Sequence, residues 1–149
     1  MNYIRKAIQE DCSRIAEIEI FNYRLNFYPI FRNDQYYFNE LRVDTQTEKY
    51  LCNPDMINNT YVYDDGVIKG FISIDEHEIK KLFVEPVLQG QSIGSVLLDY
   101  ALTNHNIKFL WALEKNTKAI SFYKKHGFYL TDERKFEDET TEYLIKLAI

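Results

Sequence analysis

The sequence predicts an α/β (α+β) fold, with a mixed, mostly antiparallel central sheet of about six or seven strands flanked by about four helices. Short runs of β-branched and aromatic residues alternate with turn residues, other segments repeat apolar residues every three or four positions, and one glycine-bearing turn joins a strand to a helix. The length of 149 residues fits a single domain over residues 1–149.

The N-terminal part is expected to contain one strand and two helices. Residues 3–7 partly alternate, as a strand does, and residues 15–25 repeat apolar side chains at the spacing of a helix with one buried face. Pro29 is expected to close that helix. A second helix is expected within residues 31–50, interrupted at residues 44–45.

Three consecutive strands are expected in the middle of the chain. Thr60 to Tyr63 and Val67 to Ile74 are rich in β-branched and aromatic residues, and Asp64-Asp65-Gly66 between them is typical of a hairpin turn. Asp75-Glu76 offers the next turn, before a strand from His77 to Val84. These segments predict an antiparallel meander.

The C-terminal part alternates helices and strands. A helix follows the turn at Gly90 and Gly94, and the remaining elements are a strand at 107–113, a helix at 117–125, and a final strand pair at 128–130 and 143–147. The acidic stretch 132–142 is interpreted as a solvated hairpin connection. The predicted order is therefore β-α-α-β-β-β-α-β-α-β-β, with helices on both faces of the sheet.

Composition excludes several classes of protein. A net charge of -5 argues against nucleic-acid binding, which needs a clustered basic face. Cys12 and Cys52 are far apart and lack the companion residues of a metal site, so neither a disulfide nor a bound metal is expected. Because residues 1–7 do not look like a leader and no apolar run could span a bilayer, the protein is expected to be cytoplasmic and not bound to a membrane.

The turn from Gln89 to Ser95 is the most informative segment for function. It is polar, contains small residues and opens a helix, whose first amide groups have no partner within the helix and can hold a phosphate. Two glycines also suit a tight turn that binds nothing. The glycine pattern of a dinucleotide-binding fold and the Gly-Lys-Ser/Thr of a P-loop are both absent from the sequence.

Two motifs in this chain resemble the GNAT superfamily of acetyl-CoA-dependent N-acetyltransferases. The first is Ile79-Lys80-Lys81-Leu82-Phe83-Val84-Glu85-Pro86 followed by Gln89 to Gly94 and Val96-Leu97-Leu98, where the family pattern is usually Gln/Arg-x-x-Gly-x-Gly/Ala. The second, from Asn116 to Phe128, resembles the family's late helix, Asn...Ala...Phe-Tyr...Gly-Phe. Ser92 departs from the pattern by replacing the first motif glycine.

The resemblance implies a set of residues that bind acetyl-CoA as co-substrate, without a metal. The amides of Gln89, Gly90, Gln91, Ser92, Ile93, Gly94 and Ser95 would hold its pyrophosphate, the backbone of Phe83 and Val84 would pair with the pantetheine arm and the acetyl carbonyl, and Asn116 would contact the arm. Tyr123 would be a cofactor contact as well as the general acid for the leaving thiolate, although it could also be a tyrosine packed on the sheet. Glu78 is the candidate base, and it could equally be a solvent-facing strand residue, with His77 as a substitute.

The aromatic surplus suggests where the acceptor amine binds. Twelve tyrosines and ten phenylalanines include a concentration between residues 21 and 50. Tyr28, Phe31 and Tyr36 are expected to line the acceptor pocket, together with Tyr23, Phe27 and Tyr37, some of which must be core. The acceptor is expected to be a primary amine of a small molecule, an amino acid or a peptide. The alternatives are a non-catalytic acyl-CoA-binding or regulatory domain and a dimeric interaction module whose aromatics form a homodimer face.

Overall fold

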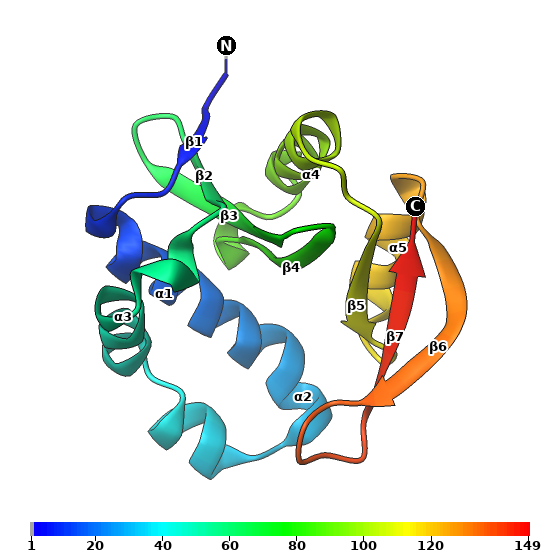
Figure 1. Cartoon of the computed structure of the whole chain (residues 1–149). Helices are drawn as coiled ribbons and strands as arrows, with labels where there is room; N and C mark the ends of the chain where they lie inside the picture. Colours follow the sequence, from blue (N-terminus) through cyan, green and yellow to red (C-terminus); the bar gives the residue numbers. More distant parts are fainter. Residues whose placement is uncertain (1) are drawn as a thin grey trace.

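The computed structural model describes residues 2–149, and within them one seven-stranded sheet runs in the order β1-β2-β3-β4-β5-β7-β6 (Figure 1). The strands are β1 Ile4–Lys6, β2 Thr60–Asp64, β3 Ile68–Asp75, β4 Glu78–Val84, β5 Phe109–Leu113, β6 Tyr129–Phe136 and β7 Tyr143–Ala148. Neighbouring strands are antiparallel except β4 and β5, which are parallel. The predicted mixed, mostly antiparallel sheet is confirmed.

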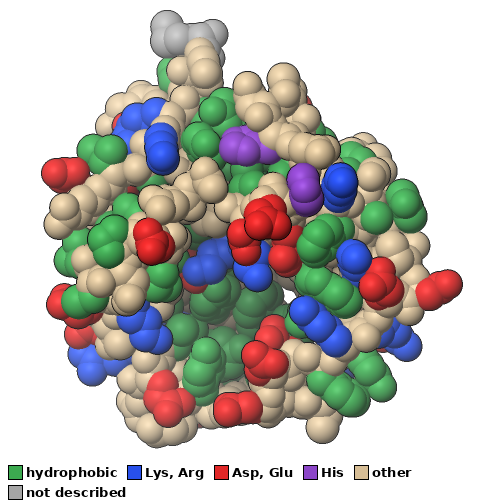
Figure 2. Space-filling view, in the orientation of Figure 1, with side chains coloured by type: hydrophobic (Ala, Val, Ile, Leu, Met, Phe, Trp, Pro, Cys, Tyr) green, Lys and Arg blue, Asp and Glu red, His purple; other side chains and the backbone are tan. Residues whose placement is uncertain are grey.

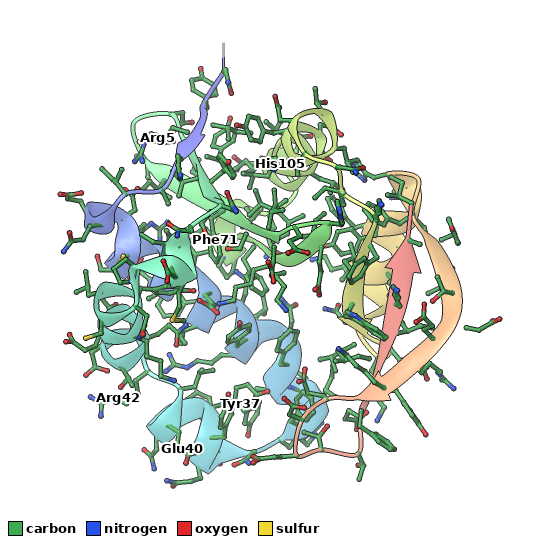
Figure 3. The ribbon with its side chains drawn as sticks, in the orientation of Figure 1. Arg5, Tyr37, Glu40, Arg42, Phe71 and His105 are labelled. Carbon is green, nitrogen blue, oxygen red and sulfur yellow. The ribbon has the colours of Figure 1, made fainter. Side chains whose placement is uncertain are left out.

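Five α-helices, rather than about four, occur in the described part of the chain: α1 Cys12–Asn22, α2 Tyr28–Phe31, α3 Val43–Cys52, α4 Ile93–Asn104 and α5 Thr117–Lys125. Helices α1 and α3 cover one face of the sheet, where Phe71 of β3 packs against α1 (Figures 1 and 3). Helices α4 and α5 cover the other face, around Ile72, Leu97 and Leu98. The helices therefore flank both faces, as the sequence predicts.

The prediction that Pro29 ends the first helix is wrong. Helix α1 continues through a π-helical segment, Tyr23–Phe27, into α2, where Pro29 occupies an early helical position. Proline has no amide to donate, and here it directly follows a π-helical segment, in which the regular i→i−4 hydrogen bonding is already interrupted. The chain leaves the helix only at Arg32, which adopts a left-handed φ of 51°.

The predicted break at residues 44–45 is also wrong, because Asp44 and Thr45 lie in the first turn of α3. The Asp44 carboxylate accepts a hydrogen bond from the Thr45 amide at 2.8 Å, and a negative charge stabilises the N-terminal end of a helix. The segment before it, Gln35–Glu40, forms a second π-helical stretch.

Strand β6 extends well into the acidic stretch that was interpreted as a connection. Its residues pair with β7 as far as Phe136 opposite Tyr143, so the connection is confined to residues 137–142. The acidic and basic side chains of β6 are exposed on the outermost strand of the sheet. Charges on an edge strand discourage pairing with other chains, which explains why a polar sequence forms a strand here.

The feature that creates the site is the short contact between β4 and β5. The two strands pair only at Glu78 with Phe109 and at Ile79 with Leu110, whereas β5 pairs with β7 over its whole length. Between Ser73 and Ile74 the register with β4 shifts, so Lys80 is an extra residue in β4. Beyond this bulge, β4 and β5 diverge and leave a wedge-shaped opening in the sheet.

No helix formed by residues 2–149 is both long and apolar enough to cross a membrane.

Candidate active site

A cleft of about 880 Å³ lies where β4 and β5 diverge. One wall is residues 79–84 of β4, the other is residues 110–113 of β5, and the cleft extends to the turn before α4 and to one side of α5. The end of α1 and the π-helical segment close it with Asn22, Tyr23, Asn26 and Phe27. The space-filling view shows a central hollow on this face, with hydrophobic side chains inside it and both basic and acidic side chains around it (Figure 2).

The turn before α4 has the backbone of an anion site. Gly90 has a φ of 87° and Ser92 a φ of 68°, and helix α4 begins at the next residue, Ile93. The first regular helical bond there is donated by the Val96 amide to the Ser92 carbonyl, so the amides of the preceding turn point out of the helix end. Such amides, together with the helix dipole, favour a bound phosphate.

The residues predicted to hold the pyrophosphate do not all line the cleft. The cleft is lined by Gln89, Gly90, Ser92, Ile93, Gly94 and Ser95, whereas Gln91 is exposed outside it. The Gln89 amide is already used, because it donates to the Pro86 carbonyl at 3.4 Å. Fewer residues can therefore offer an amide to a bound anion than the sequence predicted.

The left-handed backbone of Ser92 explains why a glycine is usual at this motif position. Only glycine adopts a positive φ without steric cost, and another residue pays about 1 kcal/mol or more. Serine nevertheless preserves the turn in this chain.

The backbone of β4 presents alternate residues to the cleft. The backbone N–H of Glu85 donates to the Lys69 carbonyl at 2.9 Å, so the backbone polar groups of Glu85 point toward β3. Along an antiparallel pair, the backbone groups of successive residues point alternately toward and away from the partner strand. The N–H and C=O of Val84 therefore point away from β3, and those of Phe83, opposite Phe71, point toward it. Of the two residues predicted to pair with the cofactor arm, Val84 alone has backbone groups facing the opening. Phe83 lines the cleft without offering it a backbone hydrogen bond.

Tyr123 and Asn116 come from α5 and its N-cap. Tyr123 is 9% exposed, lines the cleft and packs edge-to-face on Phe122 and Phe128 at ring distances of 5.3 and 5.6 Å. Burial raises the pKa of its phenol, which therefore stays protonated at neutral pH. Asn116 also lines the cleft, and its side-chain oxygen caps α5 by accepting from the Ala119 amide at 3.3 Å.

Glu78 lies at the closed end of the wedge, where β4 and β5 still pair, and not among the residues that line the cleft. Its carboxylate is 3.7 Å from the Lys80 ammonium. The neighbouring His77 forms a hydrogen bond of 2.8 Å with the Asn106 carbonyl on the outside. The cleft does contain a carboxylate that the sequence did not indicate, Glu137 from the β6–β7 connection. Its position depends on the path of that connection, which composition does not reveal.

The aromatic residues divide into three groups. Tyr23 and Phe27 line the cleft and stack at 5.2 Å. Tyr37 is buried core, while Tyr28, Phe31 and Tyr36 lie outside the cleft. Tyr23 contacts β4 through an edge-to-face contact with Phe83, and Phe27 lies beside it in the same π-helical segment.

Phe31 instead lines a second hollow of about 530 Å³, formed with residues 139–142 of the β6–β7 connection. The hydroxyl of Tyr28 donates to the Asp34 carboxylate at 2.5 Å. Tyr36 is 43% exposed, and the partial burial of its phenol, together with the charges of Glu137 and Glu40, raises the pKa of that group. None of these three predicted residues lines the cleft.

A buried ion pair beside the cleft was also not predicted from the sequence. The Glu19 carboxylate of α1 is 1% exposed and lies 2.7 Å from the ammonium of Lys81, which lines the cleft. It also accepts from the Tyr50 hydroxyl and, at 2.5 Å, from the Tyr23 hydroxyl. This cluster holds the Tyr23 ring against Phe83, at a ring distance of 5.4 Å. In residues 2–149 no group of three or more His, Cys, Asp or Glu side chains is arranged to hold a metal ion.

Comparison with known proteins agrees with this fold and turn. A family model described as an acetyltransferase (GNAT) domain matches residues 57–130. The chain is similar to the peptidyl-lysine N-acetyltransferase YjaB of Salmonella typhimurium, with 36% identity over 46% of this chain and 48% of the relative. It is also similar to the peptidyl-lysine N-acetyltransferase YiaC of Escherichia coli, with 34% identity over 62% of each. The chain thus spans between about half and three fifths of the length of these relatives.

Among solved structures, the PaiA N-acetyltransferase of Thermoplasma acidophilum in complex with coenzyme A superposes with a TM-score of 0.66. The identity is 19%, and the match covers 96% of both chains. At this identity the similarity concerns the fold. The family-model match over residues 57–130 and the two relatives support the assignment of this chain to the GNAT superfamily.

Proposed function

We propose that this chain is an acetyl-CoA-dependent N-acetyltransferase that moves an acetyl group to a primary amine, acting as one domain over residues 1–149 in the cytoplasm. One observation carries the proposal: the wedge between β4 and β5 joins an anion-binding turn, a strand with free polar groups and a buried phenol in a single cleft. Its volume of about 880 Å³ fits a small-molecule site.

The cofactor end of the cleft suits the phosphates of acetyl-CoA. The amides of Gly90 and of residues 92–95 supply donors at the start of α4, and the exposed side chains of Lys118 and Lys125 add positive charge to the lining. Further along, the outward N–H of Val84 is available to the thioester carbonyl. Acetyl-CoA supplies the activated acetyl group when bound.

The chain's own groups support direct attack by the amine. A carboxylate takes the proton that the amine loses when its nitrogen bonds the acetyl carbon, the Val84 N–H stabilises charge on the carbonyl oxygen, and Tyr123 protonates the departing sulfur. Glu78 remains the predicted base and would act through water from the closed end, whereas Glu137 is the carboxylate inside the cleft. Comparing kcat of Glu78→Gln and Glu137→Gln identifies the base, because the loss should fall on one of them.

A lysine side chain of a peptide is the acceptor that the surroundings of the cleft favour. The named relatives YjaB and YiaC are peptidyl-lysine N-acetyltransferases. Glu137 lines the cleft, and its carboxylate can attract the ammonium group of a cationic acceptor.

The test is acetyl transfer to lysine-containing peptides, measured as thiol release and as acetyl gain in the peptide mass. Calorimetric titration with acetyl-CoA is run in parallel. Binding with turnover supports the proposal. Binding without turnover on any amine would instead favour the non-catalytic acyl-CoA-binding domain, and no binding would favour the dimeric interaction module.

A further inference from the structure

Asn22, the last residue of α1, has a buried side chain at the point where α1, β4 and the turn before α4 meet. It is 2% exposed and lines the cleft. Its amide nitrogen donates to the Ile18 carbonyl at 2.8 Å and to the Val84 carbonyl at 2.9 Å. Because carbonyls only accept, these two bonds fix which end of the amide is nitrogen.

Gln89 completes the cluster from the other side. Its side-chain nitrogen donates to the Asn22 oxygen at 3.1 Å and to the Val84 carbonyl at 3.2 Å. Its oxygen accepts from the Lys118 ammonium of α5 at 3.3 Å. The side chain of this motif residue is thus directed to β4 and α1, which ties the start of the anion-binding turn to the strand.

The Val84 carbonyl is consequently saturated. A carbonyl oxygen has two lone pairs, and here both have donors, Asn22 and Gln89. Without these donors the outward carbonyl would be free to accept a hydrogen bond from the cofactor arm. The peptide after Val84 is held on both sides, because its N–H, that of Glu85, donates to the Lys69 carbonyl and its C=O accepts from Asn22 and Gln89. Of the two outward backbone groups of Val84, the N–H is therefore the one that stays open to the cleft.

We propose that Asn22 is a positioning residue for acetyl transfer, acting through Val84. It holds the β4 backbone so that the Val84 N–H faces the acetyl carbonyl, and through Gln89 it couples this geometry to the turn that binds the phosphates. The inference rests on the proposed function, since it concerns how the same cleft orients the thioester.

The side-chain amide of Asn22 is required because its nitrogen donates to the Ile18 and Val84 carbonyls while its oxygen accepts from Gln89. The isosteric change Asn22→Asp keeps the shape but puts a carboxylate against the carbonyls of Ile18 and Val84, where both bonds are lost. A misplacement of about 1 Å at a reacting group can cost on the order of 100-fold in rate. We therefore expect Asn22→Asp to lower kcat at least about tenfold, with the Kd for acetyl-CoA changed less than about threefold.

Asn104→Asp is the matched control. Asn104 also ends a helix, α4, and its nitrogen donates to the carbonyl four residues earlier, Tyr100, at 2.9 Å, but the side chain is exposed and lies outside the cleft. It should keep the wild-type kcat. Gln89→Met provides a second variant, since it removes one of the two donors to Val84 with an unbranched side chain of similar length.

The experiment measures kcat, KM and acetyl-CoA Kd for wild type, each variant and the double variant. If Asn22 acts through Val84 and Gln89, the two changes should be non-additive in kcat, because both act on one carbonyl. Wild-type kcat in a folded Asn22→Asp, or strict additivity in the double variant, would overturn the inference. If Asn22→Asp does not fold, an unchanged kcat in Gln89→Met would overturn it. A wild-type protein without acetyl transfer would instead overturn the proposed function.

Discussion

Replacing Tyr123 by phenylalanine removes one oxygen from the cleft and leaves the ring in place. The ring packs on Phe122 and Phe128 through its carbon atoms, so the variant should keep α5 and its surroundings. If the phenol is the general acid, the rate of the chemical step falls about 100- to 10,000-fold. That corresponds to about 3 to 5 kcal/mol of transition-state stabilisation.

Two other quantities should change little in this variant. Loss of one hydroxyl alters the free energy of unfolding by about 1 kcal/mol or less, and the Kd for acetyl-CoA should stay within about threefold, since the anion-binding turn is separate from the phenol. Thiol release under single-turnover conditions, calorimetry and urea unfolding measure the three quantities.

The pH dependence gives a second check on Tyr123. Burial raises the pKa of the phenol, so the protonated form is present below its ordinary value of about 10 and is lost only as the pH rises through the higher folded value. Wild-type kcat should therefore not decline on the alkaline side before about pH 10 because of this group. A kcat within about twofold of wild type for Tyr123→Phe would refute the assignment.

Three further changes test the fold around the cleft. In Gly70→Ala the new Cβ would lie 2.9 Å from the Phe83 carbonyl oxygen, so we expect a loss of about 1 to 3 kcal/mol in urea unfolding, and an unchanged midpoint would contradict the close packing of β3 on β4. Ser92→Val places a β-branched residue at a φ of 68° and should weaken acetyl-CoA binding at least about tenfold by calorimetry, whereas Ser92→Gly should bind at least as well as wild type. Lys81→Met leaves the buried Glu19 carboxylate without its ammonium and should cost about 3 kcal/mol of stability; equal unfolding curves would show that the pair contributes nothing.

Local signals made much of the fold predictable. The meander β2 to β4 follows from β-branched runs divided by Asp-Gly and Asp-Glu turns, and α5 occupies the predicted residues Thr117–Lys125. Its boundaries are encoded locally, by Asn116 as N-cap and by Gly127, whose φ is 96°, just after the helix. The helices between Pro29 and Thr45 were not predictable in this way, because proline and polar residues are compatible with the first turn of a helix as well as with a break.

The site was predictable only where a motif lies in one segment of the chain. The turn at Gly90 and Ser92 is contiguous and could be found from its residues. Asn22 and Glu137 enter the same cleft from segments more than 100 residues apart, and nothing in their neighbours marks them. The contacts of these two residues depend on the register of β4 and on where β5 diverges from it. No local sequence pattern predicts either feature.

The most direct test of N-acetyltransferase activity is acetyl transfer from acetyl-CoA to a lysine-containing peptide. Thiol release and peptide mass are followed together, with Tyr123→Phe as the matched variant. We expect stoichiometric release of CoA and gain of one acetyl group by the peptide, both strongly reduced in the variant. Tight binding of acetyl-CoA with no acetyl gain by any peptide or small amine would contradict it.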